Sequence, residues 1–291
     1  MKTLKTYIPC VILSILLVFS LLGTSAAVTI KIISGKNFFI GIAEKNNVVS
    51  SIQTQLEKHF KDEYNETGIP AEIFTDSFTD EYIDSVVKMN IDSGFEALSG
   101  KAYSNTTIPN NRLEESIETF FSDYADSIGY EKDDNYYEKL QNTIDSAYDT
   151  LNDYCDVYKF GTMNNAGILS KLEKVYMNIN LILAVTIISV LVLVVLMAIV
   201  CRKYLMSILY WIGSSSIVAG IIGLIPSAYL YALRFFDSFT IKQPQIFASF
   251  TGIMYKTTSI FIIAQVAKLL FGLLLIIAFI IFSKRKKSNS N

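Results

Sequence analysis

The sequence predicts an all-α integral membrane protein with four transmembrane helices and a large extracytoplasmic helical-bundle domain inserted between the first and second. Three observations predict this class. The apolar residues concentrate in four runs, each reaching the roughly 20 residues that a helix needs to cross about 30 Å of hydrocarbon. Nearly all the acidic residues gather in one long segment. That segment shows helical periodicity throughout.

The four apolar runs are Ile8 to Ile30, Ile179 to Val200, Leu205 to Leu233, and Ser259 to Phe282. None of them contains Asp or Glu, which favours membrane helices over the buried helices of a soluble fold. The predicted organisation is a cytoplasmic N-terminus and first transmembrane helix at 1–33, an extracytoplasmic acidic helical domain at 34–178, transmembrane helices at 179–200 and 205–233, a short outer aromatic loop at 234–258, a fourth transmembrane helix at 259–282, and a basic cytoplasmic tail at 283–291.

Charge sets the predicted orientation. The segment 34–178 holds 26 of the 27 acidic residues and 12 Lys and Arg, which leaves it a net charge of −14. The basic residues outside it include three short groups: Lys2 and Lys5, Arg202 and Lys203, and the "SKRKK" that follows the last run. Alternation of the spans puts these groups on one face, and an excess of Lys and Arg in short loops marks that face as cytoplasmic. The acidic segment is therefore expected outside.

The first run has a basic start, an apolar core and the small-residue stretch "GTSAA", as a cleaved signal peptide would. Its apolar character continues through Val28 and Ile30, which favours an uncleaved signal anchor. Either interpretation leaves the acidic segment outside. We expect the outer domain to lack a disulfide, because Cys155 is its only cysteine. Lys outnumbers Arg 21 to 4, and together with the missing disulfides this predicts a Gram-positive bacterial cell-surface protein in the plasma membrane.

The acidic domain is expected to be a bundle of helices. A first helix covers Asn46 to Tyr64 and ends at "TGIP", and Thr79 caps the second. "SGKAYSNTTIPNN" is predicted to be a loop. A third helix ends just before Gly129, and a fourth runs between Asp133 and Phe160. From Ile168 the pattern enters the second membrane run without Pro or Gly, which predicts one helix of some 30 residues, either a transmitting stalk or a plain spacer.

Two ligand hypotheses arise from this domain. Asp145 and Asp149 lie four residues apart on a convex helix face without the glycine-bearing loop of a calcium site, which favours a solvated face over a cation site. Five tyrosines at 136, 137, 148, 154 and 158 either belong to the core and its rim or line a ligand site, and the core is favoured. We predict no cofactor and no metal.

The third span carries the small residues Gly213, Ser216, Gly220 and Gly223. Such spacings let helix backbones approach closely. Packing within the chain's own bundle is favoured over a dimer seam. The loop that follows is rich in Phe and is expected to lie in the outer interface, with its apolar face in lipid.

Two polar residues interrupt the fourth span. Gln265 and Lys268 form a candidate intramembrane polar site, with Asp237 the nearest acid. Lys268 is expected about 7 Å below the boundary, so its side chain either snorkels to the headgroups or contacts Asp237. A substrate or proton pathway is disfavoured because no span contains an acid.

Catalytic signatures are missing from the sequence, and its single histidine, His59, is expected at a helix surface. We predict a non-enzymatic protein that senses or binds another membrane or envelope protein, with no nucleic-acid partner. The order of one span, a large outer domain, two spans, a short loop and a last span resembles the FtsX and MacB class of permeases. That resemblance lies in topology and implies an alternative: a membrane subunit of a transport or mechanotransmission complex that works with a cytoplasmic ATPase. The short cytoplasmic segments "CRKYLMS" and "SKRKKSNSN" are the surfaces expected to dock such an ATPase, with Arg202 and Lys203 as the candidate docking residues.

Overall fold

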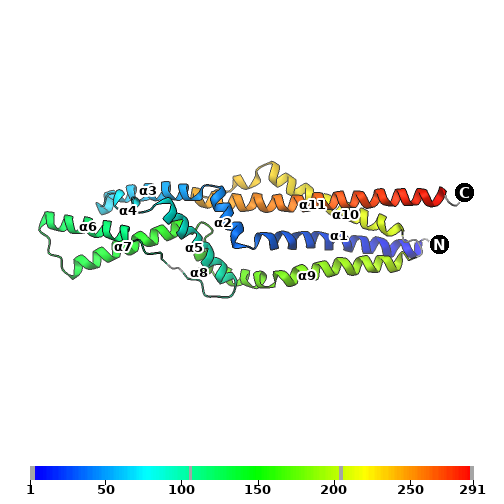
Figure 1. The fold of residues 1–291 in the computed structure, drawn as a ribbon, viewed down its shortest axis with the longest axis horizontal. Coiled ribbons are helices and arrows are strands. Elements are labelled where there is room, and N and C mark those ends of the chain that lie inside the picture. The colour runs from blue at the N-terminus through cyan, green and yellow to red at the C-terminus, as the bar shows by residue number, and fades with distance from the viewer. Residues whose placement is uncertain (1–3, 105–106, 203–205, 289–291) are drawn as a thin grey trace. The chain divides into compact units, whose positions relative to one another are not determined.

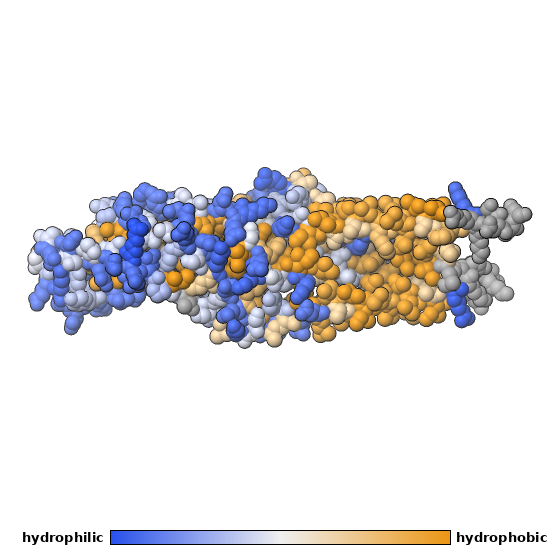
Figure 2. Space-filling model, viewed as in Figure 1, coloured by the Kyte–Doolittle hydropathy of each residue, from blue (hydrophilic) through white to orange (hydrophobic). Residues whose placement is uncertain are grey.

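The computed structural model describes residues 4–104, 107–202 and 206–288. Within these ranges the regular secondary structure is entirely helical. Four helices are long and apolar enough to cross a membrane: α1 (Leu4–Ile33), α9 (Ile168–Val200), α10 (Met206–Ala232) and α11 (Pro244–Ser288) (Figure 1). The predicted all-helical class and the four candidate spans are confirmed. Figure 2 shows hydrophobic side chains gathered over these helices and hydrophilic ones over the remainder.

The chain divides into two compact units. The membrane unit comprises Met1–Gly35, Met177–Phe239 and Ile253–Asn291. The acidic unit comprises Lys36–Tyr176 and Thr240–Gly252. Two helices, α9 and α11, contribute residues to both units, because each crosses a unit boundary without interruption.

Seven helices make up the main part of the acidic unit: α2 (Lys36–Lys45), α3 (Val48–Thr67), α4 (Glu72–Thr75), α5 (Asp80–Leu98), α6 (Asn111–Ile128), α7 (Asp134–Cys155) and α8 (Phe160–Asn165). Their apolar faces meet in one core, where Ile52, Ile83 and Ile117 are completely buried. Helical spacing puts these positions on single faces, so burial of the faces holds the helices together.

Helix ends in this unit follow the predicted signals. The Thr79 side chain accepts a hydrogen bond from the Tyr82 amide at 3.2 Å and so caps α5. The Asp133 carboxylate caps α7 in the same way, through the Tyr136 amide at 2.9 Å. Gly129 ends α6 with φ of 65°, a left-handed conformation that glycine adopts without a steric cost. Of the predicted loop, residues 105 and 106 lie outside the described residues.

The predicted fourth helix is too long by one turn. Helix α7 ends at Cys155, whereas the sequence pattern predicts a helix reaching Phe160. The cause is Asp156, whose carboxylate accepts hydrogen bonds from the amides of Phe160 and Gly161 at 2.8 and 2.9 Å. An acid that satisfies these amides begins a new helix, α8, in place of the last turn of α7.

The segment 234–258, predicted to be an outer loop, is largely helical. It forms a short 3₁₀ turn, Phe235–Ser238, and then α11 begins at Pro244, well before the predicted start at Ser259. Proline is well suited to the first turn of a helix because it lacks the amide hydrogen that would be unpaired there. The first turns of α11 pack in the acidic unit: Ala248 contacts its core, and a Cβ at Gly252 would lie 2.8 Å from the Ile42 side chain.

In the membrane unit, α1 packs against both α9 and α10. Leu17 of α1 and Met197 of α9 belong to one cluster of apolar side chains and are almost completely buried in it. The hydroxyls of Ser20 and Ser189 lie 3.0 Å apart, and the Ser215 hydroxyl donates to the Ser14 carbonyl at 3.3 Å. Contacts through small polar residues are typical of helices that associate within a bilayer.

Candidate functional site

The row of small residues on α10 lies against α11. A Cβ at Gly213 would lie 3.0 Å from the Gly272 carbonyl oxygen, and a Cβ at Gly272 would lie 2.7 Å from the Gly213 carbonyl oxygen. A Cβ at Gly220 would lie 2.6 Å from Leu269. Ser216, between these glycines, is also buried. The backbones of α10 and α11 therefore approach closely at Gly213 and Gly272, and a side chain at Gly220 would displace Leu269. Gly272 is the lone glycine of its apolar run, and no sequence pattern marks it as a contact residue.

Gln265 is the most deeply buried polar group of the predicted intramembrane site. Its side chain is fully inaccessible and packs against Gly223, where a Cβ would lie 2.6 Å from the Gln265 Cδ and Oε1 atoms. Neither Oε1 nor Nε2 has a hydrogen-bond partner among the described residues. A buried amide without partners costs about 1–3 kcal/mol, so its presence in a span calls for an explanation.

Lys268 and Asp237 have different partners. The Lys268 ammonium donates to the Leu21 carbonyl oxygen of α1 at 3.3 Å. The Asp237 carboxylate lies 2.6 Å from the Arg234 Nε and accepts a hydrogen bond from the Tyr255 hydroxyl at 2.9 Å. The lysine is thus held by a backbone carbonyl, and the acid is already neutralised by its neighbouring arginine. The structure does not bring Asp237 and Lys268 together.

The predicted cytoplasmic docking residues follow α9. Arg202 is exposed in the connection to α10, and Lys203 lies outside the described residues. Beside Arg202, the Cys201 thiol is buried and lies 3.2 Å from the Cys10 thiol of α1. Sequence spacing gives no signal for this contact, because the two cysteines are 191 positions apart.

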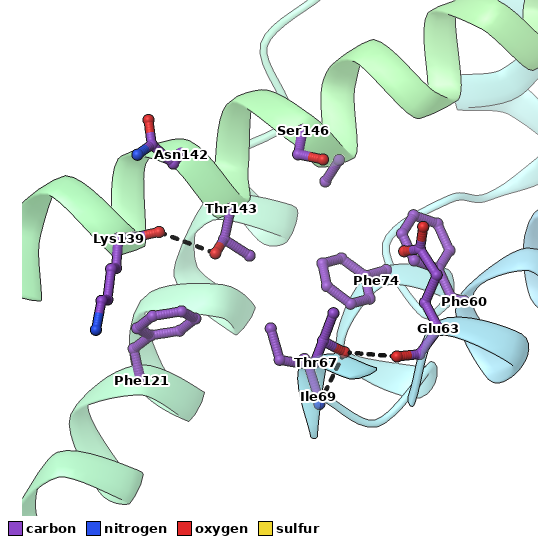
Figure 3. A pocket seen from close by; sticks show the side chains of 11 residues that line it. Phe60, Glu63, Thr67, Ile69, Phe74, Phe121, Lys139, Asn142, Thr143 and Ser146 are labelled. Atoms are coloured by element: carbon purple, nitrogen blue, oxygen red, sulfur yellow. Dashed lines mark hydrogen bonds between the residues drawn. The ribbon is translucent and has the colours of Figure 1, made fainter. Parts of the chain in front are cut away.

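A cleft of about 370 Å³ opens in the acidic unit, between α3 and α4 on one side and α6 and α7 on the other (Figure 3). The rings of Phe60 and Phe74 are stacked with centroids 4.3 Å apart, and Phe121 lies across from them. The polar lining includes Glu63 and Lys139. A cleft with an aromatic wall and both signs of charge suits a ligand that has an apolar body and charged ends.

Glu63 and Lys139 differ in their surroundings. The Glu63 carboxylate lies 3.1 Å from the His59 Nε2, on the same helix. The Lys139 side chain is exposed and forms no ion pair with any described residue. Thr143, one turn along α7, donates its hydroxyl hydrogen to the Lys139 carbonyl at 2.9 Å. Lys139 therefore offers an exposed ammonium group at the cleft that could meet an acidic group of a ligand.

Asp145 and Asp149 lie on an exposed face of α7, beside Glu114 and Glu118 of α6. The Asp145 carboxylate accepts a hydrogen bond from Gln141 at 3.0 Å. Within the described residues no group of three His, Cys, Asp or Glu side chains is placed to share a metal ion. The tyrosines considered as ligand contacts are divided between core and surface: Tyr136 and Tyr148 are buried, whereas Tyr137 is 57% exposed.

A partly buried polar network connects the loop that precedes α6 to the helices around it. The Tyr148 hydroxyl donates to Glu114 at 2.7 Å and accepts from the Asn110 amide at 2.7 Å. The Asn110 side chain donates to the Ser77 carbonyl at 2.9 Å. Burial raises the pKa of the Tyr148 hydroxyl to about 12, and the Glu114 carboxylate contributes to this rise. This network is structural, since its donors and acceptors are occupied by one another.

Comparison of the chain with protein-family models, with curated proteins and with solved structures gave no match.

Proposed function

We propose that this chain is a non-enzymatic, multi-pass plasma-membrane protein whose acidic unit lies outside the cell and senses or binds a membrane or envelope protein. Both termini are cytoplasmic in this proposal. The distribution of charge supports it, because the short connection at Arg202 and the tail are basic while the segment 34–178 is strongly acidic.

The observation that carries the proposal is that α9 and α11 have one end in the core of the acidic unit and continue as candidate spans. Leu169 of α9 is buried in that core, and Ala248 of α11 packs against it. The stacked Phe60 and Phe74, which line the cleft, belong to the same core. A partner that reshapes the cleft would therefore disturb the packing around the ends of two membrane helices.

A photo-crosslinking amino acid at position 139 of the full-length protein tests the binding role in native membranes. We expect specific adducts with one membrane or envelope protein, identified by mass spectrometry, and loss of those adducts when Phe121→Ala opens the aromatic wall. The same probe at Lys171, an exposed lysine outside the cleft, is the control. If positions 139 and 171 give the same adducts, the cleft has no specific partner and the proposal fails.

The alternative is a membrane subunit of a transport or mechanotransmission complex that works with a cytoplasmic ATPase. The continuity of α9 and α11 also suits this role, because a rigid helix transmits tilt or rotation. It requires a docking surface at Arg202 and Lys203. Purification from native membranes in mild detergent should then retain an ATPase, and Arg202→Glu with Lys203→Glu should release it without preventing membrane insertion. Retention of the ATPase by this double variant would exclude the predicted docking residues.

A further inference from the structure

The membrane unit contains a second cleft, of about 480 Å³, between α1, α10 and α11. Its walls are mainly apolar and include Leu22 and Ala26 of α1, Leu230 of α10, and Phe261 of α11. It lies near one end of the first two helices, because α1 ends at Ile33 and α10 ends at Ala232. Its volume is within the range of sites that bind small molecules.

Two hydroxyl groups in this cleft have no hydrogen-bond partner in the part of the chain that the structure describes. Thr29 is 4% exposed and Thr257 is half-buried, and the Oγ1 atom of each is without a partner among the described residues. Hydroxyls in apolar helices commonly donate to a carbonyl of the preceding turn. Two neighbours in the same cleft do so: Thr258 donates to the Met254 carbonyl and Ser227 to the Gly223 carbonyl, both at 2.7 Å. Thr29 and Thr257 therefore hold unused donors.

A further polar side chain, that of Gln265, packs behind the apolar wall of this cleft. Gly223 lines the cleft, and the unpaired amide of Gln265 packs directly on it. Buried hydrogen-bond donors in folded proteins nearly always have acceptors, and the donors of this cleft lack them among the described residues. A ligand that fits must bring an acceptor group and a long apolar body together.

We propose that this cleft binds one glycerophospholipid, with an acyl chain along the apolar walls and an ester carbonyl oxygen accepting hydrogen bonds from Thr29 and Thr257. Thr29 lies four residues before the end of α1, which at 1.5 Å per residue is about 6 Å. That is the depth at which hydrocarbon gives way to the ester and headgroup region of a bilayer. A helix of a second copy is a poorer occupant, because its backbone carbonyls are already engaged within the helix. This inference is independent of the binding role proposed for the acidic unit.

The test uses the full-length protein in vesicles of phosphatidylglycerol and phosphatidylethanolamine that contain a trace of phospholipid with a photoreactive acyl chain. After irradiation and digestion, we expect adducts to concentrate on the cleft segments 22–30 and 257–261. Ala26→Trp fills the cleft from an exposed position and should reduce these adducts at least tenfold. Val185→Trp, on the exposed surface of α9, adds the same bulk elsewhere and should leave them unchanged.

A second measurement isolates the hydroxyl groups. Native mass spectrometry of the detergent-solubilised protein should show one retained phospholipid, and Thr29→Val with Thr257→Val should reduce that retention several-fold. Thr258→Val removes a hydroxyl that is already bonded within its own helix, so it should retain the lipid. Adducts spread evenly over α9 and insensitive to Ala26→Trp would mean ordinary annular lipid and overturn the proposal. Cross-linked dimers that exclude the lipid from the cleft would also overturn it.

Discussion

Buried polar side chains have different contacts in the acidic unit and in the membrane unit. In residues 36–176 of the acidic unit, Asp156 accepts from two amides and Asn152 donates to Thr107 at 3.3 Å, whereas the buried hydroxyl of Ser77 has no partner among the described residues. In the membrane unit, contacts between helices depend on glycines and small hydroxyls, and the side chains of Gln265 and Thr29 are buried without partners among the residues that the structure describes. Apolar burial holds the first unit together and polar pairs define its loops, whereas close backbone approach holds the second.

Helix α11 is an exception to this difference between the two units. Gln245, which belongs to the acidic unit, is as completely buried as Gln265 and likewise has no partner among the described residues. Among the described residues, α11 thus carries one buried, unpaired amide in each unit. Buried polar groups without partners are rare in folded proteins, so these two amides call for a structural explanation.

The largest expected effect concerns packing in the acidic unit. Gly94 of α5 lies against the ring of Phe160, and a Cβ there would overlap the ring atoms. We expect Gly94→Ala to lower the free energy of unfolding by about 2 kcal/mol, because overpacking outweighs the better helix propensity of alanine. Thermal unfolding of the detergent-solubilised protein, followed by circular dichroism, measures this.

Gly41→Ala is the matched control for that variant. Gly41 is also helical, and apart from its chain neighbours and the backbone of its own helix no described atom lies within 4 Å of the position its Cβ would take. Alanine should therefore raise stability by up to about 1 kcal/mol. Equal stability of the two variants would refute the close packing of α5 on α8.

Gln265→Leu tests the unpaired amide of the membrane unit. Replacing a partnerless buried amide by an apolar side chain of similar size should raise the free energy of unfolding by about 1–3 kcal/mol. Gln141→Leu, at an exposed position of α7, should stay within about 0.5 kcal/mol of the parent protein. A loss of stability in Gln265→Leu would show that the amide is bonded in the membrane, and the contrast between the units would then disappear.

The carboxylate of Asp156 is expected to make the free energy of unfolding depend on pH. Burial raises its pKa above the ordinary 3.8, although the amides of Gly161 and Phe160 and the charge of Lys159 oppose the rise. The folded state therefore binds this proton more tightly than the unfolded state does. As the pH falls through the raised pKa, stability from this group increases, by at most about 1.4 kcal/mol per pH unit, and it levels off below 3.8.

Asp156→Asn should lack this component, so the difference in stability between parent and variant should grow in favour of the parent on acidification. Asp145→Asn, on the exposed face of α7, removes one carboxylate charge elsewhere on the same unit and serves as the control. Denaturant titrations between pH 7 and pH 4 provide the comparison. A parent-minus-variant difference that shrinks on acidification would mean that hydrogen bonds from the amides dominate over burial.

The smallest expected effect is at a helix cap. Thr79→Ala removes the side-chain acceptor for the Tyr82 amide and should cost about 1 kcal/mol. Thr54→Ala, inside α3 at an exposed position, removes a hydroxyl bonded to the Ser50 carbonyl and should cost less. Equal losses in these two variants would show that the cap does not contribute to the stability of the acidic unit.

Periodicity and local signals were sufficient for the long helices. Apolar spacing located α3, α5 and α6, and Thr79 and Gly129 marked helix ends, because these features depend on residues close in sequence. The short helices α4 and α8 were not predicted. Helices of that length are unstable alone and form only when tertiary contacts, such as those of Phe160, stabilise them.

The candidate site was predicted in part. Small residues on α10 were recognised, but their partner Gly272 was not, because a lone glycine gives no sign of the helix it will contact. The pairing of Asp237 with Arg234 had a local signal, since the two residues are three positions apart. The Leu21 carbonyl that binds Lys268 had none, because 247 positions separate the two residues and every residue carries a carbonyl.

The most direct test of the account asks which side of the membrane the acidic unit occupies. Thr119→Cys places a thiol on an exposed position of α6, and Lys284→Cys places one near the basic end of α11, while the native cysteines 10, 155 and 201 are buried. With a membrane-impermeant maleimide on intact cells, we predict labelling at position 119 and labelling at position 284 only after permeabilisation. Labelling of position 284 in intact cells, with position 119 protected, would invert the topology and contradict the proposed extracellular binding role.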